Sequence, residues 1–249
     1  MDRAFFALLS KVARTAISGE RKKGLNVTNK EAGGYDPVTE ADRATERFLR
    51  QKIEETYPNH GIWGEEYGFV RENAAVQWSL DPVDGTRALV CGLPSWAVLV
   101  GLIVDGEHVA GMIDLPALDE TLVAVDGVTQ SNGAALRTSG CERLAEARLA
   151  TTDPYLFVDP APFDRVRKAA RLTRYGLDAL AYARVATGDL DLVVESGLKR
   201  HDYDALVAVV RGAGGVIGNW SGGSDLSEGA VVAAASHPLY EEAVGLLAE

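Results

Sequence analysis

Cysteine is scarce in this chain of 249 residues, and the two that occur, Cys91 and Cys141, lie far apart. Neither has a cluster of His or Cys residues around it in the sequence. A disulfide framework and a zinc site both need several such ligands at short spacing, so neither is indicated. We therefore expect a reducing compartment, and with no leader evident, the cytoplasm.

Clustered positive charge is missing as well. The chain has 25 lysines and arginines against 36 aspartates and glutamates, a formal net charge of -11 at pH 7. Proteins that bind nucleic acid or anionic membranes present a basic stripe or patch, and none is evident here. We expect neither kind of partner.

Long apolar runs are absent from the start of the chain. Apolar residues recur at helical spacing over residues 5–17, and Lys11 and Arg14 interrupt them. A signal peptide or a membrane span needs an unbroken apolar stretch, so this pattern predicts an amphipathic helix instead. With 47% hydrophobic residues, the chain has enough apolar side chains for a globular core.

Helix and strand signals divide the chain into two halves. A polar stretch at residues 24–35 predicts a mobile loop, and a capping-box pattern at Thr39 and Asp42 begins a helix expected over 39–57. Short apolar runs at 78–80, 96–104, 108–113 and 121–125, with a hairpin signal at Asp105-Gly106, predict a largely antiparallel sheet.

Beyond residue 160 the pattern alternates between helix-like and strand-like stretches, which favours a sheet covered by helices. The stretches are 163–174, 178–187, 191–195, 205–211, 216–220, 230–235 and 237–247. We place a boundary near Gly140. It separates an N-terminal α+β subdomain, 1–139, from a C-terminal α/β subdomain, 140–249.

The segment with the most chemical content is Asp81-Pro82-Val83-Asp84-Gly85-Thr86. A strand brings Asp81 to a stiff turn, Asp84 returns to the same side, and glycine lets the backbone approach a ligand where a helix can begin. Carboxylates and a carbonyl at this density suit a hard cation such as Mg²⁺, and the amides of Gly85 and Thr86 suit a phosphate. The same residue types also form tight surface turns, so this segment alone leaves both interpretations open.

Four further segments stand around this motif in the order found in one enzyme family. They are Asp36-Pro37-Val38-Thr39-Glu40-Ala41-Asp42, Gly64-Glu65-Glu66, His201-Asp202-Tyr203-Asp204-Ala205 and Gly212-Ala213-Gly214-Gly215. Together they resemble the inositol monophosphatase family of lithium-sensitive, metal-dependent phosphatases, over nearly the whole chain. The resemblance implies the layered αβαβα sandwich of the inositol monophosphatase/fructose-1,6-bisphosphatase type. It also implies Mg²⁺ as cofactor, with Mn²⁺ as a possible substitute, and a homodimer.

Carried over from the resemblance, the metal ligands are Glu65, Asp81, the carbonyl of Val83, Asp84 and Asp202, with Asp81 bridging two ions. Asp42 would assist a third ion through water. Taken separately, Glu65 could be a solvated acid and Asp202 a helix start at the surface. Their shared order favours a joint function, since a motif needs context. Counting back from Ala213-Gly214-Gly215 selects Asp202 over Asp204.

The resemblance also implies a mechanism with no covalent intermediate. Thr86, supported by Glu65 and the metal held by Asp84, positions the attacking water, while amides of Gly85 and Thr86 hold the phosphate. Thr86 could also be a helix N-cap. His201 departs from the family's usual tryptophan, and we interpret it as a packed or exposed histidine. Bound cations would offset the repulsion between an acidic protein and an anionic ester.

Two acids in the second half, Asp178 and Glu195, are expected to recognise the alcohol part of the substrate. Relatives that act on inositol phosphates have a small residue where Asp178 stands, so a second carboxylate suits a cationic leaving group. Asp178 could instead cap a helix, and Glu195 could simply end a strand. Residues 86–96, 111–116 and 150–157 resemble the histidinol-phosphate phosphatase branch.

The expected reaction is therefore hydrolysis of L-histidinol phosphate in histidine biosynthesis. Two alternatives remain: a phosphatase for inositol-1-phosphate or another small phosphomonoester, and a metal-binding regulatory or scaffold protein without turnover.

Overall fold

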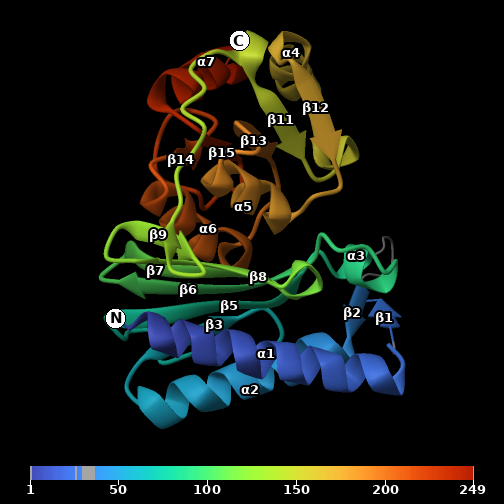
Figure 1. Cartoon of the computed structure of the whole chain (residues 1–249), viewed down its shortest axis with the longest axis vertical. Helices are drawn as coiled ribbons and strands as arrows, with labels where there is room; N and C mark the ends of the chain where they lie inside the picture. Colours follow the sequence, from blue (N-terminus) through green and yellow to red (C-terminus); the bar gives the residue numbers. More distant parts are fainter. Residues whose placement is uncertain (1, 26, 30–36, 249) are drawn as a thin grey trace.

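The computed structural model describes residues 2–25, 27–29 and 37–248, and its helices and sheets stack in five alternating layers (Figure 1). A helix pair, an eight-stranded sheet, a second helix pair, a five-stranded sheet and a third helix pair follow one another along the long axis. This is the αβαβα sandwich that the sequence predicted. None of the helices in the described part is long and apolar enough to cross a membrane.

The first layer consists of α1 (Arg3–Lys23) and α2 (Glu40–Thr56). Helix α1 buries Phe6, Leu9, Ala13 and Ile17, which recur every three or four residues and so share one face. The predicted capping box begins α2, and the helix expected over 39–57 is confirmed. Part of the predicted mobile loop lies outside the described residues, but β1 (Val27–Asn29) within it pairs with β2 (Pro37–Thr39).

The eight-stranded sheet is antiparallel except where β3 and β5 pair. Its strands, in the order β10-β9-β8-β7-β6-β5-β3-β4, are Ala134–Ala135, Val128–Ser131, Glu120–Val125, Glu107–Leu115, Ala97–Val104, Val76–Asp84, Gly61–Gly64 and Gly68–Val70. The predicted hairpin at Asp105-Gly106 joins β6 to β7. In β6, Val98 and Val100 face the α1–α2 core while Leu99 faces the middle layer, because helices cover both sides of the sheet.

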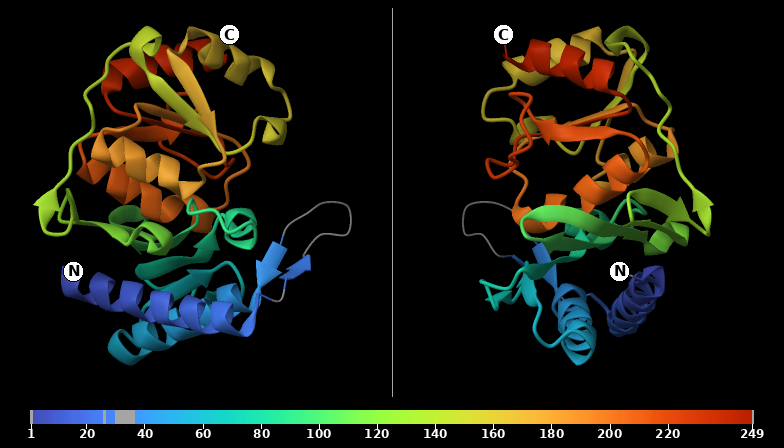
Figure 2. Two further views of the ribbon diagram at one scale, coloured as in Figure 1. Left: turned by 45° about the vertical axis from the view of Figure 1, so that its right-hand side comes forward. Right: turned by 90° about the vertical axis from the view of Figure 1, so that its left-hand side faces the viewer.

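The five-stranded sheet has the order β12-β11-β13-β15-β14. These strands are Leu172–Tyr175, Arg148–Thr151, Leu192–Glu195, Val231–Ala234 and Val216–Asn219. The outer helices α4 (Ala161–Ala169) and α7 (His237–Ala248) cover one face, and α5 (Ala179–Thr187) and α6 (Arg200–Gly212) lie between the two sheets (Figure 2). The eight-stranded sheet ends at Ala135 and this one begins at Arg148, while the division at residue 140 stays a prediction.

One predicted stretch, 163–174, was wrong as a single helix-like element. Helix α4 ends at Ala169, and Leu172–Tyr175 forms the edge strand β12, which pairs in parallel with β11. Pairing with a neighbouring strand is not visible in local periodicity, so it overrides the helical pattern. Helix α6 also begins five residues earlier than the stretch 205–211 suggested.

Helix α6 lies directly on the backbone of the eight-stranded sheet. Gly101 and Gly111 face each other in neighbouring strands, beneath Asp204 and Ala205. A Cβ at Gly101 would lie 3.0 Å from the Ala205 nitrogen, and one at Gly111 would overlap the Ala205 carbonyl oxygen. Glycine is therefore required at this crossing, and it fixes the height of α6 above the sheet.

We expect Gly111→Ala to lower the free energy of unfolding by about 1–3 kcal/mol, because the added methyl meets backbone that no side-chain rotation can clear. Urea denaturation measures the loss. Gly19→Ala is the matched control, since Gly19 lies in α1 with open space around its Cα. That change should raise stability by up to about 1 kcal/mol. Equal stability of the two variants would contradict the packing argument.

Candidate metal and phosphate site

A cavity of about 400 Å³ lies where the end of β5 meets the starts of α5 and α6. Apart from Asp42, every residue predicted for metal binding, catalysis or substrate recognition lines it. These residues are Glu65, Asp81, Val83, Asp84, Gly85, Thr86, Asp178, Glu195 and Asp202. The fold therefore brings together acids that are far apart in the sequence. Glu65 and Asp202, for example, are more than 130 positions apart.

Three carboxylates form the centre of the cavity. Asp81, Asp84 and Asp202 each offer an oxygen, and these oxygens lie within 4.8 Å of one another. Burial first, and the charges of neighbouring acids second, raise the pKa of Asp81 and of Asp84 well above the ordinary value. Crowded, desolvated carboxylates of this kind are stabilised by a divalent cation, and oxygen ligands suit Mg²⁺ or Mn²⁺.

The Asp81–Thr86 segment is a bulged strand end rather than a surface turn. Asp81 pairs with Leu99 and Asp84 with Ala97, so β5 has one residue more than β6 across this interval. Pro82, which has no amide hydrogen to donate, falls inside the bulge. The buried Asp81 carboxylate accepts a hydrogen bond from the Val83 amide at 3.0 Å. The extra residue turns both aspartates into the cavity.

Thr86 begins α3 (Thr86–Val90), after Gly85 in the left-handed conformation at φ 76°. Its hydroxyl lies 3.0 Å from the Val83 carbonyl oxygen and 3.1 Å from Asp42 Oδ1. Gly85 occupies the N-cap position of α3 and has no side chain, so no side-chain hydrogen bond caps this helix. The buried Asp42 also accepts from the Thr39 amide, and burial raises its pKa to about 6. Asp42 therefore supports Thr86 from behind the cavity wall.

Glu65 follows β3, and a buried acid from α2 holds its turn in place. The Glu46 carboxylate accepts hydrogen bonds from the backbone amides of Glu66 at 2.7 Å and Tyr67 at 3.2 Å. Arg50 pairs with the same carboxylate at 2.7 Å. Sequence reasoning missed Glu46, because nothing in a helical glutamate indicates that it will bind a distant loop.

Asp202 lies in the first turn of α6, where its carboxylate accepts a hydrogen bond from the Lys199 amide at 2.6 Å. Asp202 is therefore part of the helix start, as one interpretation had it, and it also lines the cavity. His201 is buried, lines the cavity and places Nε2 3.5 Å from Asp202 Oδ1. Asp204 is buried outside the cavity, so Asp202 is the aspartate that faces the other acids.

Asp178 precedes α5 but does not cap it. Its side chain makes no capping hydrogen bond, and the Ala179 amide donates to Asp84 instead, at 2.7 Å. The capping interpretation is therefore wrong. Asp178 has φ 49° and ψ -141°, a conformation that costs about 1–3 kcal/mol for a residue with a side chain. Burial raises its pKa to about 6, although nearby Arg87 lowers it. A Cβ at Gly85 would touch this carboxylate.

Glu195 ends β13 and is almost fully buried. Its carboxylate accepts from the Thr152 amide at 2.6 Å, the Thr152 hydroxyl at 2.9 Å and the Thr151 hydroxyl at 3.3 Å. Burial raises its pKa to about 7 in spite of these donors. Thr152 also lines the cavity, and sequence reasoning gave it no role.

Tyr182 was also missed. Its hydroxyl is buried at the cavity and has no hydrogen-bond partner among the described residues. Burial, with Glu195 and Asp84 nearby, raises its pKa well above the ordinary value, which keeps the phenol protonated. Tyr182 follows Asp178 by four residues, and a helix over the expected stretch 178–187 would have placed both on one face, so the spacing could have identified it. A buried phenol without a partner is suited to bind a substrate group.

Comparisons with known proteins agree with this geometry. The family model for the inositol monophosphatase family matches residues 1–249. The chain is 38% identical over 237 residues to the bifunctional phosphatase IMPL2, chloroplastic, of Arabidopsis thaliana, a match covering 90% of this chain and 68% of the relative. A histidinol-phosphatase of Chlorobaculum parvum is 30% identical over 207 residues, with 82% and 80% covered.

Comparison with solved structures gives the same family. An inositol monophosphatase from Zymomonas mobilis superimposes with a TM-score of 0.88 at 37% identity, covering 99% of this chain and 97% of the other. The layered sandwich is therefore of the inositol monophosphatase type. From motif, cavity and comparison together, the chain belongs to the inositol monophosphatase family, and so to the phosphoric monoester hydrolases.

Proposed function

We propose that this phosphatase is Mg²⁺-dependent and hydrolyses L-histidinol phosphate to L-histidinol and phosphate. The observation that carries the proposal is a second pair of carboxylates, the half-buried Asp178 and the buried Glu195, in the same cavity as the acidic cluster. The name of one relative, a histidinol-phosphatase, supports the branch. Inositol-1-phosphate is the second candidate, supported by the similarity to an inositol monophosphatase of known structure.

The cluster residues Glu65, Asp81, Asp84 and Asp202, with the Val83 carbonyl, would hold Mg²⁺, which lowers the pKa of water and neutralises charge on the phosphate and the leaving oxygen. Thr86 acts on the attacking water. A hydroxyl has one hydrogen and two lone pairs, so a Thr86 hydroxyl that donates to Asp42 or Val83 keeps a lone pair to accept from water.

The phosphate would lie against the first turn of α3. The amides of Ala88 and Leu89 already donate to the Gly85 carbonyl. Those of Gly85 and Thr86 come before them and have no acceptor within the helix, as at any helix start. Gly85 lets this backbone approach the ester closely, since it has no side chain.

The leaving group would contact Asp178 and Glu195, which line the same cavity. L-Histidinol carries an amine and an imidazole, and Asp178 and Glu195 would contact these groups. A hydrogen bond between charged groups is about twice as strong as a neutral one, so a cationic leaving group gains more here than a polyol does. The buried phenol of Tyr182 offers a further hydrogen bond.

We expect activity to require Mg²⁺ or Mn²⁺ and to disappear in excess chelator. Asp84→Asn and Asp202→Asn should each lower kcat/KM by about two orders of magnitude or more, because each removes a charge that holds the cation. Steady-state hydrolysis of p-nitrophenyl phosphate measures this, with the exposed, remote Asp105→Asn as control. Full activity in chelator would contradict metal dependence. A scaffold protein would show no turnover with or without Mg²⁺.

A substrate panel tests the leaving group. With Mg²⁺, L-histidinol phosphate should have a higher kcat/KM than inositol-1-phosphate, AMP or fructose-1,6-bisphosphate, because only its leaving group is cationic. Asp178→Asn should reduce this preference over an aryl phosphate by about 1–3 kcal/mol. An equal loss on both substrates would mark Asp178 as structural. A preference of the unchanged enzyme for inositol-1-phosphate would overturn the branch assignment alone.

Tyr182→Phe separates substrate contact from packing. We expect kcat/KM for L-histidinol phosphate to fall. The loss of transition-state stabilisation should be about 0.5–1.5 kcal/mol, the usual net value of one hydrogen bond. The melting temperature should stay the same or rise, because the hydroxyl has no partner in the described protein to lose. Thermal unfolding followed by circular dichroism measures the melting temperature, and steady-state kinetics measures kcat/KM, each on Tyr182→Phe and on the unchanged protein. A lower melting temperature with unchanged kinetics would refute the role.

The homodimer, the absence of nucleic-acid and membrane partners, and the cytoplasmic location remain predictions. The net charge of -11 supports the absence of polyanionic partners. Size-exclusion chromatography with light scattering tests the dimer directly.

A further inference from the structure

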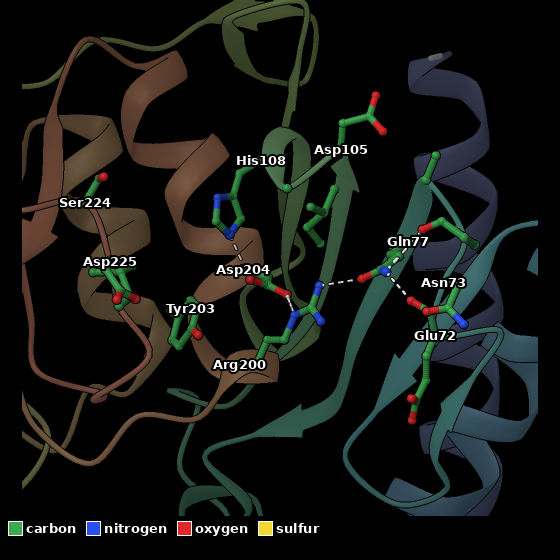
Figure 3. A pocket seen from close by; sticks show the side chains of 15 residues that line it. Glu72, Asn73, Gln77, Asp105, His108, Arg200, Tyr203, Asp204, Ser224 and Asp225 are labelled. Carbon is green, nitrogen blue, oxygen red and sulfur yellow. Dashed lines mark hydrogen bonds and ion pairs between the residues drawn. The ribbon is translucent and has the colours of Figure 1, made fainter.

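The first turn of α6 separates the metal cavity from a second cavity of about 570 Å³ (Figure 3). His201 and Asp202 line the metal cavity, whereas Arg200, Tyr203 and Asp204 line the second one. Side chains in the second cavity are joined in a chain of hydrogen bonds that runs from His108 through Asp204 and Arg200 to Gln77. This chain crosses from α6 to the eight-stranded sheet.

Arg200 is the centre of this network. Its Nε donates to Asp204 Oδ2 at 2.9 Å and its Nη2 to Gln77 Oε1 at 2.8 Å. The Cζ atom lies 5.5 Å from the ring centroid of Trp63 and 5.9 Å from that of Phe69, and these two rings meet edge to face. A planar guanidinium can stack on rings and donate in its own plane at once, which an ammonium cannot do.

The partners of Arg200 are themselves held in place. The Asp204 carboxylate is almost fully buried and also bonds to His108 Nε2 at 2.8 Å. Gln77 donates to the carbonyls of Glu72 at 2.9 Å and Ala74 at 3.1 Å. The network therefore has fixed ends on β7, on the segment before β5 and on α6.

The segments that hold Trp63 and Gln77 continue into predicted metal ligands, and so does the helix that holds Arg200 itself. Trp63 lies two residues before Glu65, Gln77 lies four residues before Asp81, and Arg200 itself lies two residues before Asp202. One guanidinium thus connects β3, β5 and α6 just behind the point where each presents its carboxylate. The carboxylates repel one another, so some fixed contact behind them must oppose their separation.

We propose that Arg200 is a positioning residue that sets the spacing of Glu65, Asp81 and Asp202 for the cation. The proposal rests on the metal-dependent function above. Arg200 does not line the metal cavity, so it acts through the segments that carry the ligands and does not compete with the cation for them.

The test is Mn²⁺ binding to the chelator-treated full chain, measured by isothermal titration calorimetry. Arg200→Met keeps an unbranched apolar stem and removes the guanidinium. We expect the Kd for Mn²⁺ to rise by about ten- to a hundredfold, the usual effect of losing a residue that orients metal ligands. The Mg²⁺ concentration for half-maximal activity should rise in parallel, with kcat largely recovered at saturating Mg²⁺.

Arg14→Met is the matched control. Arg14 pairs with buried Asp114 at side-chain exposures of 27% and 0%, close to the 30% and 2% of Arg200 and Asp204. Both variants should lose thermal stability, but Arg14→Met should bind Mn²⁺ like the unchanged protein. If Arg200→Met does not fold, Arg200→Lys replaces it, and its Kd should also rise because the stacking on Trp63 is lost.

Three results would overturn the proposal. One is an unchanged Kd in the folded Arg200 variant, and another is an equal rise in Arg14→Met. In both cases the metal-dependent function would stand. The third is a failure of the protein without substitutions to bind Mn²⁺. That result would refute both the proposed function and the positioning role.

Discussion

Repulsion between crowded carboxylates is the constraint on which this structure depends. Asp81, Asp84 and Asp202 hold oxygens within 4.8 Å of one another, and burial weakens the screening that water would supply. Such a cluster costs free energy in the protein alone, and the surrounding backbone must hold it together. Its supports are the bulge at Pro82, the Lys199 amide that donates to Asp202, and the Ala179 amide that donates to Asp84.

The supports come from opposite layers. The strand end of β5 belongs to the eight-stranded sheet, while α5 and α6 form the middle layer. Close contact between them needs Gly101 and Gly111, where any side chain would push α6 away. The acidic site and the packing of the core are therefore two aspects of one arrangement, and a phosphate ester would enter where the layers meet.

Local patterns predicted much of this. The capping box of α2, the hairpin at Asp105-Gly106 and the Asp81–Asp84 motif all depend on residues close in sequence, and spacing alone reveals them. Edge strand β12 was missed because its only support is pairing with β11. Glu46 and Arg200 were missed for a similar reason. Each acts on a segment distant in the sequence, so neither has a local pattern that distinguishes it from an ordinary surface charge.

Helix α6 has one more consequence. It contributes Val207, Val209 and Val210 to the central core and, in its first turn, Asp202 to the cavity. A cation binds at that turn only while the helix is in its place, and the helix cannot leave without opening the core. Occupancy of the site and cooperative unfolding of the chain are thus thermodynamically linked, so the concentration of free cation should set the stability of the whole protein rather than the order of one loop.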